Sequence, residues 1–186
     1  VFSRTERQPK PNLMDTSQFR EIVSHFPIEG EIVGIDRFGN GHINDSYFIG
    51  TAGESVPDYV LQRINHNIFK DVELLQQNID CVTRHIRQKL EIAGTADIDR
   101  KVLKFIPAKD GRRYHFDGEN YWRVMIHIPC SLSYEARTRE YSRYAGLAFG
   151  EFQSMLADIA DKLGGVIPDF HNMEFRLRQL DDAVAE

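Results

Sequence analysis

The chain has 186 residues, of which 41% are hydrophobic, and a net charge of −5. This size suits one well-packed core, or a small domain with part of another. The acidic balance excludes the overall basic field that recruits nucleic acid or anionic lipid. No apolar run approaches the roughly 18 residues of a membrane span, and Cys81 and Cys130 lack the spacing of a zinc site or disulfide framework. We therefore expect a cytoplasmic protein with neither nucleic acid nor membrane as a partner.

Residues 1–30 are predicted to form a loose polar arm and one short helix. The sequence Asp-Thr-Ser at residues 15–17 supplies good N-cap types. Four apolar residues at helical spacing then define a buried face: Phe19, Ile22, Val23 and Phe26. Pro27 and Gly30 are expected to end this segment.

Three strands are predicted next, at about 32–38, 44–50 and 59–64. Glycine-bearing connections separate them, so an antiparallel meander is the simplest pairing. A long helix follows, because apolar residues step by three and four through Val72, Leu75, Ile79, Val82 and Ile86 until Gly94. Two further strands, at about 102–107 and 121–128, complete a five-stranded antiparallel sheet packed with one long helix. The predicted fold class is α+β.

The remainder is predicted to be helical. Residues 129–133 break the strand pattern, and a second long helix is expected over about 134–163 before Gly164 and Gly165. Apolar residues on its face are Tyr144, Ala148, Phe152, Met155, Ile159 and Leu163. A final helical pattern joins Met173, Leu177, Leu180 and Val184 and reaches the end without a stop signal, which predicts a truncated chain. The expected organisation is an arm and short helix (1–30), a small lobe (31–128), and a hinge with the start of a truncated large lobe (129–186).

The most informative segment is FGNGHINDSYF, residues 38–48. Gly39 and Gly41 lack a Cβ, so the backbone there can take positive φ and approach an anion closely with its N–H groups. An ordinary hairpin turn is the competing interpretation of the same glycines.

The order of several motifs resembles one family. These motifs are GNGHINDSY (39–47), YVLQRINHNIF (59–69), the helix from Lys70, YWRVMIHI (121–128), FGEFQSML (149–156) and VIPDFHN (166–172). Together they resemble the aminoglycoside phosphotransferase and choline kinase group of protein-kinase-like enzymes, and most closely its N-acetylhexosamine 1-kinase-like branch. The resemblance implies a kinase-type small lobe followed by the first helices of the large lobe.

The resemblance also implies a nucleotide site. The residues expected over the phosphates are Gly39, Asn40, Gly41 and Asn44. Val60 and Met125, with Val33, are expected to sandwich the adenine ring, unless they are plain core. Backbone groups of the hinge at His127, Ile128 and Cys130 would meet the adenine edge.

The third strand departs from the family pattern. A lysine usually stands there, neutralises phosphate charge and pairs with a glutamate of the following helix, but this chain has Gln62. Either Gln62 binds phosphate through hydrogen bonds alone, or its neighbour Arg63 reaches round from the other face of the strand. Glu73 is the candidate helix carboxylate, and it also suits a helix N-terminus.

Catalytic residues are not expected within these 186 residues. HFDGEN, residues 115–120, approximates the HxDxxxxN catalytic loop, but its spacing is wrong and Asp-Gly between strands predicts a hairpin. The proton acceptor and the Mg²⁺ ligands are therefore expected beyond Glu186. The parent reaction would transfer the ATP γ-phosphate to a small sugar such as an N-acetylhexosamine, and the chain itself would be inactive.

Two alternatives stay open. A degenerate kinase lobe that binds nucleotide or a partner without catalysis would also fit, as would an amino alcohol, aminoglycoside or homoserine acceptor. An artefactual dimer through exposed helices is expected around Phe149, Phe152 and Phe175.

Overall fold

The computed structural model describes residues 16–39, 41–131 and 138–185. In chain order the elements are α1 (Thr16–Ser24), β1 (Glu31–Arg37), β2 (Asp45–Ala52), β3 (Tyr59–Ile64), α2 (Val72–Ile92), the 3₁₀ turn η1 (Ile98–Arg100), β4 (Phe105–Ile106), β5 (His115–Phe116), β6 (Tyr121–Ile126), α3 (Arg139–Leu156), the 3₁₀ turn η2 (Ala160–Lys162) and α4 (Met173–Ala185). The α+β prediction is confirmed within these residues.

The sheet is antiparallel, with the order β1-β2-β3-β6-β4 and with β5 paired to β6. The predicted meander of the first three strands is confirmed. The predicted total of five strands is wrong, because the described residues form six. The extra strand, β5, has only two residues, and the strand expected over 102–107 shrinks to Phe105–Ile106. Short edge strands of this kind leave little periodicity to recognise.

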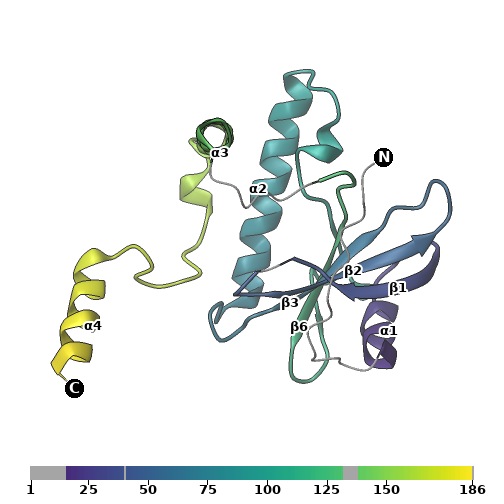
Figure 1. Cartoon of the computed structure of the whole chain (residues 1–186), viewed down its shortest axis with the longest axis horizontal. Helices are drawn as coiled ribbons and strands as arrows, with labels where there is room; N and C mark the ends of the chain where they lie inside the picture. Colours follow the sequence, from purple (N-terminus) through teal and green to yellow (C-terminus); the bar gives the residue numbers. More distant parts are fainter. Residues whose placement is uncertain (1–15, 40, 132–137, 186) are drawn as a thin grey trace.

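The two faces of the sheet are covered by different helices (Figure 1). All four residues of the predicted apolar face are buried, although α1 ends at Ser24 and Phe26 lies just after it, and they pack on inward-facing side chains of β2, β3 and β6. This core consists of Phe19, Ile22, Val23, Phe26, Tyr47, Ile49, Tyr59, Leu61, Ala108, Trp122 and Val124. The long helix α2 rises from the opposite side of the sheet (Figure 1).

The α2 side of the sheet carries the alternate residues of each strand. Val60 pairs with Met125, Gln62 with Arg123, and Ile64 with Tyr121 across β3 and β6. Because directly paired residues point to the same face, these pairs form successive rows on one face. Phe48 of β2 extends the row of Val60 and Met125, and Ser46 extends the row of Gln62 and Arg123. We call this surface the α2 face.

The long helix begins at Val72, the first residue of the predicted apolar stripe and two residues after Lys70. The Asp71 side chain accepts a hydrogen bond from the Leu74 N–H at 2.8 Å, which is an N-cap. Its buried residues are Val72, Gln76 and Ile86. Gly94 follows the helix with φ of +64°, the left-handed conformation typical of a helix stop.

The helix expected over 134–163 is shorter than predicted. α3 ends at Leu156, and Ile159, which was assigned to its face, is instead a buried residue (1% exposed) beside η2; residues 134–137 lie outside the described part of the chain. The contact that accompanies this early end comes from a distant part of the chain. Lys89 Nζ of α2 donates to Met155 O (2.8 Å) and to Asp158 Oδ1 (2.7 Å), so the last turn of α3 is capped from another helix. The Lys89 hydrogen bond lowers the pKa of Asp158 to about 2.

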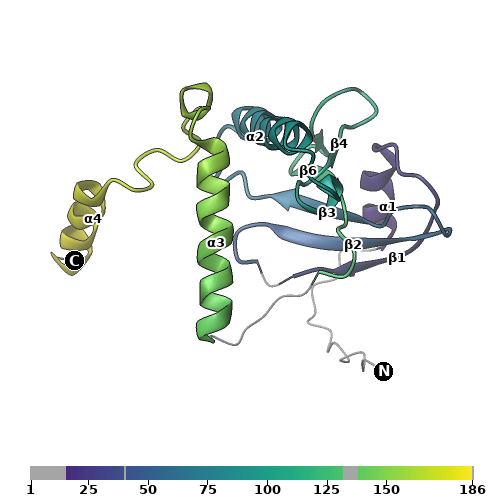
Figure 2. The same ribbon diagram turned by 90° about the horizontal axis from the view of Figure 1, so that it is seen from above.

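A second contact fixes the segment after α3. Asn78 of α2 donates from Nδ2 to Gly164 O (2.7 Å) and accepts at Oδ1 from Gly164 N (3.0 Å). A Cβ on Gly164 would lie 2.6 Å from Leu74 Cδ1, so glycine permits this approach. Figure 2 shows α3 running alongside the lobe.

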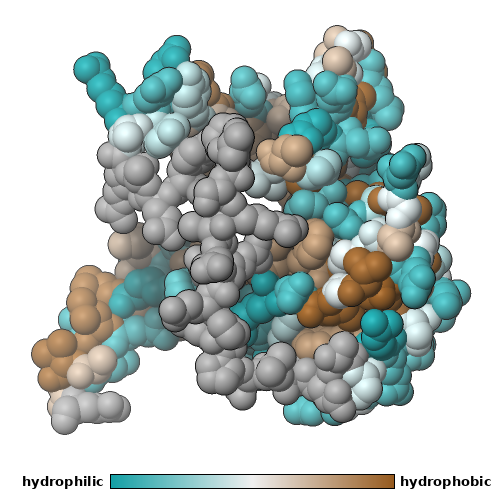
Figure 3. Space-filling model, turned by 45° about the vertical axis from the view of Figure 1, so that its right-hand side comes forward, coloured by the Kyte–Doolittle hydropathy of each residue, from teal (hydrophilic) through white to brown (hydrophobic). Residues whose placement is uncertain are grey.

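The final helix lies away from the sheet (Figures 1 and 2). Its predicted apolar residues are exposed, from 58% at Leu177 to 79% at Val184. Hydrophobic surface is visible in brown at the lower left of Figure 3. On α3, Phe149 is 70% and Phe152 is 44% exposed. Across the described ranges, no helix is long and apolar enough to cross a membrane.

Candidate functional site

The α2 face gathers three of the residues predicted to bind nucleotide, namely Val60, Gln62 and Met125. Val60 and Met125 are buried neighbours there, whereas Val33 on β1 is 66% exposed. Gln62 lies in the next row of the same face, and its amide is half-buried. The structure thus brings together three of the predicted residues on adjacent strands.

Gln62 is held by hydrogen bonds on both sides. Its Nε2 donates to Ser46 Oγ of β2 at 2.8 Å. Its Oε1 accepts two hydrogen bonds from Arg123 of β6, from Nε at 3.0 Å and from Nη2 at 2.6 Å. The position that usually carries lysine in the resembled family therefore belongs to a three-strand polar network, and the cation in that network comes from β6.

Arg123 was missed by the sequence analysis. It is only 8% exposed, and burial lowers its pKa to about 10. The signal that could have revealed it is its presence in the otherwise apolar run YWRVMI, because arginine is almost never fully buried unless something pairs with it.

Arg63 lies on the opposite face of β3, as strand alternation predicts. Its guanidinium pairs with the Asp45 carboxylate, which also accepts from Arg37 Nη2 at 3.1 Å. Asp45 and Arg63 border a hollow of about 150 Å³ beside residues 64–67 at the end of β3. Arg63 is thereby engaged away from Gln62.

The glycine turn packs against the α2 face through its first residue. Phe38, its first residue, places its ring 5.6 Å from that of His127 and 6.2 Å from that of Phe48, and the Phe48 and His127 rings are 5.0 Å apart. Gly39 has φ of +77° with open space around it. The predicted turn and the predicted hinge residue His127 are thus joined by an aromatic cluster formed by Phe38, Phe48 and His127.

The other members of the turn differ in their surroundings. Asn44 Oδ1 accepts from Asn65 N at 2.9 Å, which ties the turn to the end of β3. A Cβ on Gly41 would lie 3.6 Å from Asn44 O, an ordinary contact. Asn40 lies outside the described residues.

The hinge segment is braced by the lobe. His127 N donates to Asp58 O at 2.8 Å, so this predicted adenine contact is engaged within the sheet. Ser131 Oγ donates to Ile128 O at 3.1 Å, and Arg100 donates to Pro129 O at 2.8 Å. Cys130 is exposed and takes a left-handed φ of +55°.

Glu73 does not approach Gln62 through any hydrogen bond of the described residues. Its carboxylate accepts from Gln77 Nε2 at 3.1 Å and lies 3.7 Å from Arg113 Nη1. Burial, and then the nearby Glu73 charge, raises the pKa of Tyr114. Glu73 therefore faces the segment before β5 from the first turn of α2.

The HFDGEN segment is a hairpin, as predicted. Asp117 joins β5 to β6, and its Oδ1 accepts from Glu119 N (2.9 Å) and Asn120 N (2.7 Å). Its Oδ2 accepts from the Trp122 indole at 2.6 Å. Burial alone would raise the pKa of Asp117, but these donors together lower it. The carboxylate anchors a turn.

His115 gives the lobe a pH dependence. Its ring stacks on that of His25 at 3.8 Å, and burial, followed by the His25 charge, lowers its pKa. The folded state then binds this proton less readily than the unfolded chain does. The contribution of neutral His115 to stability is therefore complete above the ordinary pKa of 6.5, and it is lost as the pH falls through the pKa of the folded state.

We expect urea unfolding to show a steeper loss of stability from pH 7 to pH 5 in the native chain than in His115→Asn. The exposed control His42→Asn should retain the native slope, and equal slopes in all three proteins would contradict this assignment.

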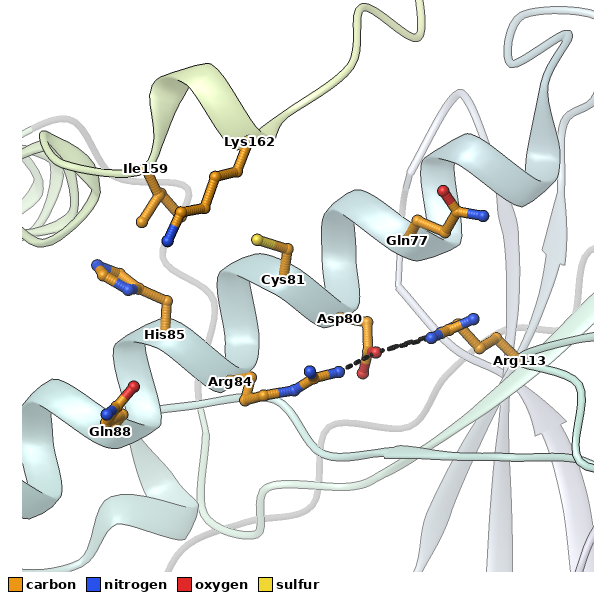
Figure 4. A pocket seen from close by; sticks show the side chains of 9 residues that line it. All are labelled: Gln77, Asp80, Cys81, Arg84, His85, Gln88, Arg113, Ile159 and Lys162. Atoms are coloured by element: carbon orange, nitrogen blue, oxygen red, sulfur yellow. Dashed lines mark hydrogen bonds and ion pairs between the residues drawn. The ribbon is translucent and has the colours of Figure 1, made fainter.

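A larger hollow lies beside α2, away from the predicted site. It encloses about 330 Å³ between α2, η2 and Arg113 (Figure 4). Its charged side chains are largely paired, since Asp80 contacts both Arg84 and Arg113, and His85 Nε2 lies 2.9 Å from Asp158. These pairs link the helix to the segments packed on it.

No family model matches this chain. The assignment of function consequently depends on the residues and geometry described above.

Proposed function

We propose that the chain is the nucleotide-binding small lobe of an ATP-dependent phosphotransferase of the aminoglycoside phosphotransferase and choline kinase type. The observation that carries the proposal is the sheet order β1-β2-β3-β6-β4, with the long helix α2 inserted between β3 and β4 and a glycine turn between β1 and β2. A glycine-rich loop, a third strand bearing a phosphate contact and a following helix are the parts with which kinases hold ATP.

The nucleotide would lie on the α2 face. Backbone N–H groups of the turn at Gly39 and Gly41 would meet the phosphates, and the apolar floor of Val60 and Met125 would meet the adenine. The aromatic cluster beside this floor offers ring faces for stacking. Backbone groups of the hinge from Ile128 to Cys130 would complete the adenine contact.

The parent reaction would pass the γ-phosphate of ATP, with Mg²⁺, to a hydroxyl of a small acceptor such as an N-acetylhexosamine. Catalysis of this type is mostly positioning and charge stabilisation, and it requires an aspartate base and metal ligands. HFDGEN serves as a hairpin, so the groups that perform the chemistry are proposed to lie outside residues 1–186. Acceptors such as an amino alcohol, an aminoglycoside or homoserine fit the same lobe.

A non-catalytic lobe that binds nucleotide or a partner is the second candidate. Gln62 in the usual lysine position favours it, because a neutral amide replaces the charge that catalytic lobes use. The exposed apolar residues Phe149 and Phe152 of α3 are compatible with a partner or with the dimer predicted above.

The proposal is tested by ATP titration of the chain in a calorimeter with Mg²⁺ present. We expect weak binding that Gly39→Asp lowers at least about five-fold, since an added carboxylate near phosphate costs on the order of 1 kcal/mol. Gly118→Asp is the matched control, because Gly118 is also an open hairpin glycine with positive φ (+105°) but lies at the β5–β6 turn.

Two outcomes count against the proposal. Absence of ATP binding, or equal losses in Gly39→Asp and Gly118→Asp, would remove the nucleotide site. In the same samples no sugar phosphorylation above a blank is expected, and measurable turnover would show that the chain already contains the catalytic groups.

A further inference from the structure

Arg123 is a buried cation for which the described structure provides no counter-charge. Its side chain sits in the middle of β6, 8% exposed, among apolar neighbours of the same strand. Across residues 16–39, 41–131 and 138–185, no Asp or Glu oxygen lies within 4.0 Å of its guanidinium. Burial lowers the pKa of Arg123 only to about 10, so the group stays positive at neutral pH.

The contacts that Arg123 does make are neutral. Gln62 Oε1 accepts from both Nε and Nη2, and the guanidinium carbon lies 5.3 Å from the centre of the Phe105 ring. A cation–π contact of this kind offsets part of the burial cost. Nη1 is buried with no hydrogen-bond partner, and a buried donor left in that state is costly.

The geometry of the Gln62 contact is informative. The Nε and Nη2 edge of an arginine is the edge that binds the oxygens of carboxylate or phosphate in a bidentate manner. Here a single amide oxygen occupies that edge. Gln62 is half-buried, so rotation of its amide would open the edge toward the α2 face.

We propose that Arg123 is the phosphate-binding cation of this lobe, that it acts from β6 in place of a lysine on β3, and that Gln62 Oε1 holds its bidentate edge until a phosphate replaces it. This inference rests on the proposed nucleotide-binding function and names the residue that supplies the charge. The phosphate would reach Arg123 beneath the glycine turn, over the row formed by Ser46, Gln62 and Arg123.

A second arginine of the sheet is already paired with a carboxylate. Arg63, adjacent to Gln62 in sequence, is paired with Asp45 on the opposite face. A phosphate that used Arg63 would have to break that pair and cross the strand. Arg123 requires only the displacement of a neutral amide.

The decisive variant is Gln62→Glu, which changes one atom type and supplies Arg123 with a permanent carboxylate. We expect its thermal unfolding midpoint to rise, because a buried cation gains its counter-charge. We expect its affinity for ATP and for tripolyphosphate to fall at least about ten-fold, since both must displace a carboxylate instead of an amide. Gln88→Glu is the same change at an exposed position of α2. It should change the two ligand affinities by less than about two-fold and the unfolding midpoint by less than about one degree.

Arg123→Met and Arg123→Lys extend the test with adenosine as the neutral ligand. Arg123→Met should lose at least about ten-fold in ATP affinity and keep adenosine binding, whereas Arg123→Lys should retain an intermediate ATP affinity. If Arg123→Met does not fold, Gln62→Glu and Arg123→Lys carry the test.

The outcomes separate the two proposals. ATP binding by the native chain that survives unchanged in Gln62→Glu overturns the role of Arg123 and leaves the nucleotide site standing. Tripolyphosphate binding that depends on Arg123, without any effect of adenosine, supports the phosphate site and contradicts the nucleotide assignment. No binding of either ligand by the native chain overturns both.

Discussion

Replacing Trp122 by alanine is expected to lower the free energy of unfolding by about 3–5 kcal/mol, the range for large aromatic side chains deleted from a core. Trp122 is 0% exposed. Its ring lies 6.1 Å from that of Phe19 and 6.3 Å from that of Tyr47, so it joins α1 to β2 and β6. Its indole N–H also donates to Asp117 at 2.6 Å. Urea unfolding followed by far-UV circular dichroism measures the loss.

A second substitution separates packing from hydrogen bonding. Trp122→Phe keeps an aromatic ring but leaves Asp117 without its indole donor. We therefore expect the free energy of unfolding to fall by about 1–3 kcal/mol. Val33→Ala is the control on the same sheet, because Val33 is 66% exposed and should change stability by less than about 0.5 kcal/mol. A Trp122→Ala protein as stable as the control would mean that the α1 core is packed differently.

Introducing a carboxylate at Val23 is the other change expected to be severe. Val23 is 1% exposed in the same core, and an ionised group there would have no described partner. Val23→Asp should cost at least about 3 kcal/mol at neutral pH, by forcing α1 off the sheet or by protonating the new side chain. The loss should shrink as pH is lowered toward 4, since the neutral acid is cheaper to bury.

Ser24→Asp is the matched control for that change. Ser24 is the next residue on α1 and is exposed, although its hydroxyl donates to Glu21 O at 2.6 Å. We expect Ser24→Asp to change the free energy of unfolding by less than about 0.5 kcal/mol, and we expect this change not to shrink as the pH is lowered. If the two variants unfolded at the same urea concentration, α1 would not be docked through Val23.

The elements predicted well were those whose sequence pattern and burial agree. The stripe of α1 and the start of α2 are set by local signals, namely helical spacing of apolar residues and the Asp71 cap. The meander followed from glycine-bearing turns between apolar runs. In each case the signals that specify the element lie within its own residues or directly beside them.

The elements predicted poorly depend on contacts with distant residues. α3 stops at Leu156 because Lys89, 66 residues earlier, caps its last turn at Met155. η2 is placed by Asn78, 86 residues before Gly164. The helical pattern continues through Ile159 in the sequence, so local reasoning extended the helix too far.

The candidate site shows the same division. Strand alternation correctly separated Gln62 from Arg63, because that property belongs to one strand. The charge beside Gln62 comes from Arg123, whose position depends on the register of β3 with β6. Register between strands 61 residues apart cannot be read from a single sequence. The carboxylate of Glu73, the candidate helix carboxylate, accepts a hydrogen bond from Gln77.

The Asn78–Gly164 contact has a mechanical consequence. Among the hydrogen bonds of the described residues, it is the last that joins α2 to the segment before α4, and a Cβ added at the neighbouring Gly165 would meet no atom within 4 Å. α4 lies well beyond this point (Figure 2). A small change in the backbone torsion angles of Gly164 and Gly165 would therefore displace α4 by a large distance. Asn78 thus fixes the point from which the chain departs toward the C-terminal helix.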